Sequence, residues 1–170
     1  MRLIGLFLLA VLFVSCEDIG VDATYDLIGT WHIERINIIV NGEVYKASAR
    51  KMEETSFDKM RWEVNADLTL DEYIAENKYR QNYEFNEETG FLVVKGFFLY
   101  PRQFFLSQIG SQLLASTPEV NPLKQDFDTQ SWQKQVEVDA IYLLDGIVAA
   151  DKIKKSESLQ IQYIFRKMIR

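Results

Sequence analysis

Apolar and polar side chains alternate along most of the chain after residue 26, which is the pattern of half-buried β-strands. In the first such stretch Trp31 and Ile33 share one phase of the alternation, whereas Ile36 and Ile38 share the other. A change of phase inside one strand indicates an extra residue, so we predict a β-bulge near Arg35.

Further alternating stretches follow, separated by short polar segments that are typical of turns. The dipeptide Asn41-Gly42 is a strong hairpin signal. The most regular alternation runs from Trp132 to Leu144 and the last from Leu159 to Phe165, and we interpret both as strands. Other strands are predicted near residues 43–47, 60–64, 68–74, 79–85 and 91–100.

The segment 101–130 is the least regular part of the chain. Phe105, Ile109 and Leu113 are spaced four residues apart, which fits a short helix. The same residues also fit a strand that is kinked at Gly110. We expect an irregular or short helical insertion here, with a flap over a binding site as its candidate role.

About eight strands in sequence, joined by hairpin-like links, predict an all-β fold. The count fits a single antiparallel up-and-down β-barrel, in which closure of the sheet removes its exposed edges. A sandwich of two sheets satisfies the same alternation, so the pattern alone leaves that alternative open.

The N-terminus differs from the rest of the chain. An apolar block from Leu3 to Val14 follows the single basic residue Arg2. It is too short to span a bilayer, but it fits the hydrophobic region of a signal peptide. The block ends at Phe13-Val14-Ser15-Cys16, which resembles the lipobox of bacterial lipoproteins.

This resemblance implies cleavage before Cys16 and acylation of that cysteine with fatty acids such as palmitate. Several acyl chains would hold the protein permanently on a membrane. The chain then divides into a signal peptide (1–15), a lipidated tether (16–26) and one domain (27–170). We expect a bacterial cell-envelope location at the outer membrane, on its periplasmic or its surface-exposed face. The alternatives are an ordinary signal peptide and a short anchor that is never cleaved.

The first strand of the domain opens with Gly29-Thr30-Trp31. This motif resembles the G-x-W opening of lipocalins and of bacterial lipocalin-like lipoproteins. The resemblance implies a lipocalin-like barrel whose end is closed by Trp31, with a basic side chain of the last strand stacked on the indole. Lys167 lies in phase with the inward residues of that strand and Arg166 one position out of phase, so both are candidates. A G-x-W triplet can also open an unrelated β-strand.

Composition and charge narrow the classes of function. The chain has 170 residues, 48% of them hydrophobic, and a formal net charge of -6, which argues against a nucleic-acid partner. One cysteine and one histidine exclude the common multi-cysteine and two-histidine metal sites. Because no nucleophile, nucleotide or cofactor motif is present either, we expect no enzyme activity, no cofactor and no metal.

Aromatic side chains recur along the predicted strands, either as filling for a small barrel or as the lining of a ligand cavity. Gln81 and Lys134 are polar and lie in phase with inward aromatic residues, and burying a polar group is costly unless it is paired. The candidate ligand-binding residues are therefore Trp62, Tyr79, Gln81, Tyr83, Lys134 and Tyr142.

Two hypotheses for function follow from these patterns. The first is a lipid-anchored envelope protein whose lipocalin-like domain binds a small hydrophobic or amphiphilic ligand. The second is a structural or protein-interaction module of an envelope complex, with a filled barrel and no ligand. A packed interior would favour the second hypothesis.

Overall fold

The computed structural model describes residues 25–96, 100–124 and 131–168. The expected signal peptide, Cys16 and most of the tether therefore lie outside the described residues, as do residues 125–130 of the expected flap.

Nine strands form one antiparallel sheet in the described part of the chain. Eight of them close into a barrel, because the last strand pairs back onto the first, whereas β2 pairs only with β1. The predicted all-β, up-and-down barrel of eight strands is confirmed. The strands are β1 (Gly29–Val40), β2 (Glu43–Lys46), β3 (Arg61–Val64), β4 (Thr69–Ile74), β5 (Asn77–Asn86), β6 (Phe91–Lys95), β7 (Arg102–Ile109), β8 (Gln112–Ser116) and β9 (Leu159–Lys167).

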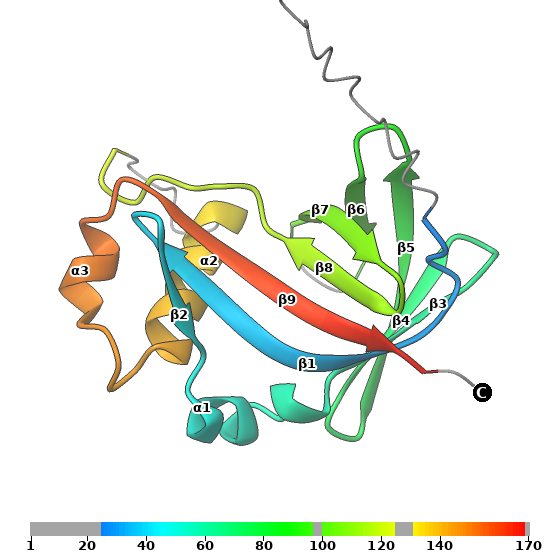
Figure 1. Cartoon of the computed structure of the whole chain (residues 1–170), viewed down its shortest axis with the longest axis horizontal. Coiled ribbons are helices and arrows are strands. Elements are labelled where there is room, and N and C mark those ends of the chain that lie inside the picture. Colours follow the sequence, from blue (N-terminus) through cyan, green and yellow to red (C-terminus); the bar gives the residue numbers. More distant parts are fainter. Residues whose placement is uncertain (1–24, 97–99, 125–130, 169–170) are drawn as a thin grey trace, which may run out of the picture.

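The longest pairing in the barrel joins β1 to β9 and runs from Trp31 opposite Lys167 to Val40 opposite Leu159. Its register shifts between Ile33 and Arg35, which confirms the predicted bulge. The extra residue changes the phase of β1, so that apolar side chains on both sides of the bulge are buried. Figure 1 shows β1 and β9 extending as a curved ribbon well beyond the shorter strands.

The alternating segment from Trp132 to Leu144 is not a strand, and this prediction was wrong. Residues Trp132–Leu143 form the helix α2, and the Ser131 side chain accepts a hydrogen bond from the backbone N–H of Lys134 at its start. Val136, Ala140 and Leu143 are buried and share one helix face at spacings of four and three. The apolar positions of this segment fit both the two-residue period of a strand and the 3.6-residue period of a helix, and packing of this face against the sheet favours the helix.

The segment 101–130 also differs from the expected short helical insertion. Phe105 and Ile109 lie on β7 and Leu113 on β8, and the two strands form a hairpin across Gly110, which has a φ of +56°. The strand interpretation with an interruption at Gly110 is therefore the better one. The helical elements of the described chain are α1 (Ala49–Glu54), the 3-10 helix η1 (Phe57–Lys59), α2 and α3 (Ala150–Lys154).

Two hydrophobic clusters lie on the inner side of the β1–β9 ribbon. The barrel core contains Trp31, Trp62, Phe104 and Phe165 among its buried side chains. The helix-covered core joins the far halves of β1 and β9 to α2 and α3, which lie beside that part of the ribbon in Figure 1. Tyr163 packs against both clusters and so marks the seam between them.

Trp31 lies near the start of β1, is fully buried in the barrel core and donates a hydrogen bond from Nε1 to the Leu27 carbonyl (2.7 Å). Register places Lys167 directly opposite Trp31, and its Nζ lies 5.3 Å from the centre of the indole. Arg166 instead pairs with Glu34 on the outside. Gly29 has a φ of +134°, and a Cβ there would lie 3.0 Å from Lys167 Cε, so the glycine leaves room for the lysine.

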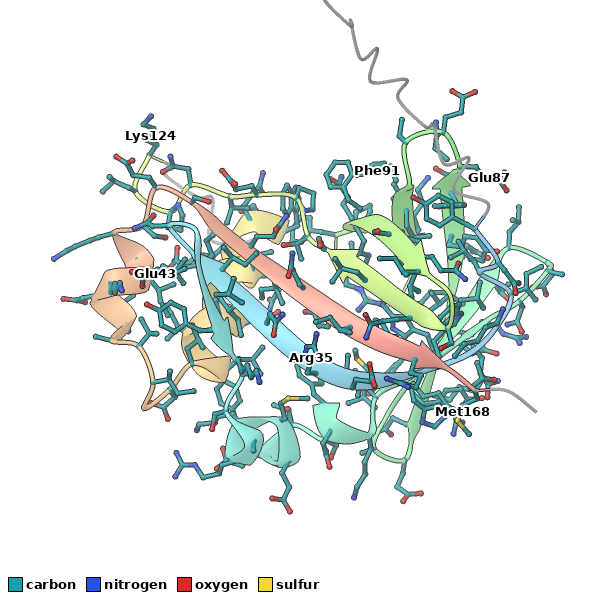
Figure 2. The ribbon with its side chains drawn as sticks, viewed as in Figure 1. Arg35, Glu43, Glu87, Phe91, Lys124 and Met168 are labelled. Atoms are coloured by element: carbon teal, nitrogen blue, oxygen red, sulfur yellow. The ribbon has the colours of Figure 1, made fainter. Side chains whose placement is uncertain are left out.

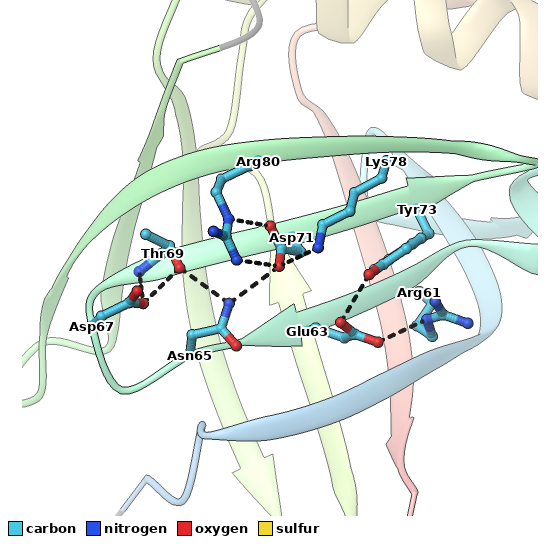
Figure 3. Close-up of polar contacts among 9 residues, drawn as sticks. All are labelled: Arg61, Glu63, Asn65, Asp67, Thr69, Asp71, Tyr73, Lys78 and Arg80. Carbon is cyan, nitrogen blue, oxygen red and sulfur yellow. Dashed lines mark hydrogen bonds and ion pairs between the residues drawn. The ribbon is translucent and has the colours of Figure 1, made fainter.

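A polar network on the outer face of β3, β4 and β5 keeps these strands in register (Figure 3). Asp71 accepts hydrogen bonds from Arg80 at 2.8 and 2.9 Å and forms an ion pair with Lys78 at 2.9 Å. The Arg80 guanidinium holds the pKa of the Asp71 carboxyl well below its usual range. Other charged side chains, such as Glu87 and Lys124 in Figure 2, project from the periphery.

We expect Lys167→Met to lower the free energy of unfolding by about 1 kcal/mol, because it removes a cation from the face of a buried indole. Arg166→Met is the matched control on the neighbouring residue, and its exposed ion pair should be worth less than about 0.5 kcal/mol. Chemical denaturation followed by tryptophan fluorescence measures both values. Equal losses in the two variants would contradict a stabilising contact between Lys167 and the Trp31 indole.

Candidate functional site

A cavity of about 710 Å³ lies at the seam between the barrel core and the helix-covered core. This volume falls within the range of small-molecule sites, about 300–1,000 Å³. Ile74 at the end of β4 and Arg102 at the start of β7 both line it. Its apolar and aromatic lining residues include Phe57, Met60, Ile74, Tyr79, Tyr100, Phe104, Trp132, Val136, Val138, Ile161 and Tyr163.

Helix α2 supplies one wall of the cavity. Trp132, Val136 and Asp139 are spaced four and three residues apart and therefore share a helix face. The neighbouring face, with Ala140 and Leu143, is buried in the helix-covered core and holds the helix in place. Val138 also lines the cavity and is 47% exposed, so this part of the lining reaches the surface of the described structure.

A buried ion pair forms the polar part of the opposite wall. Glu72 is fully buried and accepts hydrogen bonds from Arg102 Nη1 at 3.0 Å and Nη2 at 2.8 Å. Trp62 Nε1 donates to the same carboxylate at 2.9 Å and Gln81 Nε2 at 3.3 Å. Four donors thus compensate the desolvation of one carboxylate, as a buried charge requires.

The energetics of this ion pair make it a fixed part of the wall. Removing one partner of a buried pair costs about 3–5 kcal/mol, because the other charge stays buried without compensation. A ligand that pulled Arg102 away from Glu72 would meet a cost of this kind. Arg102 therefore stays paired with Glu72 and is poorly suited to bind an anionic ligand group.

Asp139 is the second carboxylate in the lining. Its Oδ1 accepts a hydrogen bond of 2.7 Å from Gln135 Nε2, and no ion pair of Asp139 occurs among the described residues. Burial raises the pKa of Asp139 to about 6, against partial compensation by Gln135 and Arg102. Burial likewise raises the pKa of Tyr163 above its usual range.

The candidate ligand-binding residues predicted from the sequence are only partly brought together. Trp62 and Gln81 meet at Glu72, and Tyr79 and Lys134 line the cavity, although Lys134 does so from a helix. Lys134 Nζ is paired with Glu137 at 2.7 Å.

The other two candidates lie elsewhere. Tyr83 is buried in the barrel core, where its hydroxyl donates to the Asn65 carbonyl at 3.2 Å. Tyr142 is 40% exposed on α2, and its hydroxyl donates to Glu54 at 3.2 Å. The expectation that Lys134 and Tyr142 point inward from a strand was wrong, because both belong to α2.

Sequence reasoning missed Glu72, Arg102 and Asp139. Glu72 shares its phase with Leu70 and Ile74, so a charge at an inward position was a usable signal. Asp139 gave no such signal, because the strand interpretation placed it outside.

Within the described chain, no group of three or more acidic, histidine or cysteine side chains is arranged to hold a metal ion. None of its helices is long and apolar enough to cross a membrane. Comparison with family models, with curated proteins and with solved structures finds no match to this chain.

We expect Asp139→Asn to raise the free energy of unfolding by about 3 kcal/mol at pH 7.5. The folded chain holds the Asp139 proton more tightly than the unfolded chain does, so the wild type loses stability as the pH rises from about 4 to 6 and stays at the lower level above pH 6. Below about pH 4 the carboxyl is protonated in both states and the difference should vanish. Thermal unfolding from pH 4 to 8 measures this, and a difference that does not depend on pH would contradict it.

Proposed function

We propose that this protein is a lipid-anchored lipoprotein of the bacterial cell envelope whose domain binds a small hydrophobic or amphiphilic ligand. The observation that carries the binding proposal is the cavity of about 710 Å³ at the seam between the two cores. Its wall is largely aromatic and aliphatic, and its polar groups are concentrated at Glu72, Arg102 and Asp139. Such a distribution suits a ligand with an apolar body and one polar end.

The two ends of the barrel have different tasks in this proposal. Around Trp31 the interior is filled, as Trp62 and Phe165 stack there with ring centres 4.4 Å apart. The ligand therefore lies at the mouth, between the barrel and α2, and not deep in the barrel. A filled barrel is what the interaction-module alternative expects, whereas the cavity at the mouth favours ligand binding.

The anchor would attach beside Trp31. Lys167 Nζ donates to the Asp26 carbonyl at 2.9 Å, and the Tyr25 hydroxyl donates to the Leu106 carbonyl at 2.9 Å. The first described residues are thus fixed beside Trp31. No chemical step is part of the proposal.

The lipid anchor is tested by Cys16→Ala, which removes the only thiol that acylation can use. We expect the variant to lose labelled palmitate and to leave the membrane fraction of the cells that make it. Ser15→Ala is the matched control, because it keeps a small residue before the cysteine and should stay acylated. Membrane retention of Cys16→Ala without label would contradict the proposal.

Ligand binding is tested by narrowing the cavity with Ile74→Trp. Ile74 lines the cavity at the end of β4, and a larger side chain there should weaken binding of 4-phenylbutan-1-ol at least about tenfold, through lost contact area. Ile109→Trp is the same substitution at a residue that is 80% exposed on the outside of the barrel, and it should bind as the wild type does.

The measurement is isothermal titration calorimetry of the acylated full chain in phosphatidylcholine nanodiscs, with empty nanodiscs as the blank. Equal affinities of the two tryptophan variants would place the binding elsewhere and contradict the proposed site.

A further inference from the structure

We propose that the ligand of this cavity carries a cationic amine next to its apolar body, and that Asp139 is the carboxylate that binds the amine. This inference rests on the proposed function and adds the chemical class of the ligand. It follows from the way in which charges are paired around the cavity.

Among the residues that the structure describes, the lining contains four charged side chains, Glu72, Arg102, Lys134 and Asp139. The first two neutralise each other through two hydrogen bonds. Lys134 is neutralised by Glu137, which lies three residues further along α2 and is itself buried. Asp139 is left over: its hydrogen-bond partner in the described structure is the neutral amide of Gln135.

A carboxylate in this position favours a cation over the other two ligand classes. An anionic headgroup would be repelled by Asp139 and would have to compete with Glu72 for Arg102. A neutral headgroup would leave Asp139 as it is, partly desolvated and without an ion-pair partner among the described residues. An ammonium group supplies the missing counter-ion and also the hydrogen-bond donors that a carboxylate accepts.

The rest of the wall is compatible with an amine. Tyrosine and tryptophan rings attract cations through their faces, and four such rings line the cavity. They belong to Tyr79, Tyr100, Trp132 and Tyr163. The apolar side chains of Phe57, Met60, Ile74 and Ile161 then provide contact for the body of the ligand.

The protonation of Asp139 makes the preference depend on pH. Its carboxyl shares the cavity with Glu72 on β4, Arg102 on β7, Tyr163 on β9 and Lys134 on its own helix. Burial raises the pKa of Asp139 to about 6, so the carboxyl is mostly ionised at pH 7.5 and mostly neutral at pH 5. An alkylamine stays protonated over this range, since its pKa lies near that of lysine, about 10.4. The preference for an amine should therefore fall as the pH is lowered.

The experiment compares three probes with the same apolar body: 4-phenylbutylamine, 4-phenylbutan-1-ol and 4-phenylbutanoate. Each is titrated calorimetrically into the acylated full chain in phosphatidylcholine nanodiscs. At pH 7.5 we expect the amine to bind at least about tenfold more tightly than the alcohol, and the carboxylate more weakly than the alcohol. At pH 5 the ratio of amine to alcohol affinity should fall toward one.

Asp139→Asn should reduce the amine-to-alcohol ratio to about one at pH 7.5. Measurable binding of the alcohol, together with a cooperative unfolding transition, shows that the variant is folded and keeps its cavity. Asp151→Asn is the matched control, because it removes the same charge from an exposed site on α3 and should keep the wild-type ratio.

The outcomes separate this inference from the proposed function. Binding of the alcohol with no preference for the amine, or a preference that survives Asp139→Asn, would overturn the inference and leave the proposed function standing. Tightest binding of the carboxylate would overturn it in the same way. Failure of all three probes to bind would overturn both.

Discussion

The antiparallel pairing of β1 with β9 is the constraint on which the rest of the structure depends. At one end it places Lys167 opposite Trp31 and closes the barrel. At the other end the same two strands run past the barrel and form the surface on which α2 and α3 pack. One ribbon therefore supports two hydrophobic cores, and the cavity lies where they meet.

Packing differs between the two sides of this seam, and the difference explains why a cavity exists. Aromatic rings fill the barrel core around Trp62, whereas the buried residues that α2 contributes to the helix-covered core are the aliphatic Val136, Ala140 and Leu143. The buried pair of Glu72 and Arg102 occupies the barrel side of the seam with four donors on one carboxylate. If apolar side chains filled the cavity, they would surround this ion pair with groups that cannot form hydrogen bonds, which is costly. The polar wall is therefore compatible with an unfilled volume beside it.

The sequence predicted the barrel because alternation is local and each strand carries its own signal. The bulge near Arg35 was readable for the same reason. The prediction for Trp132 to Leu144 was wrong because the apolar positions of this segment fit both a strand and a helix. Only the packing of the segment against the ribbon selects the helix. The site was predicted only in part. Gln81 was recognised as an inward polar residue, but its partners Glu72 and Arg102 come from other strands. Asp139 faces the cavity only because its segment is a helix.

The central claim is that the seam between the two cores is an occupied ligand site in the cell. Native mass spectrometry of the full-length protein, isolated from the cells that make it, tests it most directly. The account predicts a bound small molecule in the wild type that is lost when Ile74→Trp narrows the cavity and kept when Ile109→Trp changes the outer face. A clean unliganded mass for the wild type, or a bound molecule retained by Ile74→Trp, would contradict it.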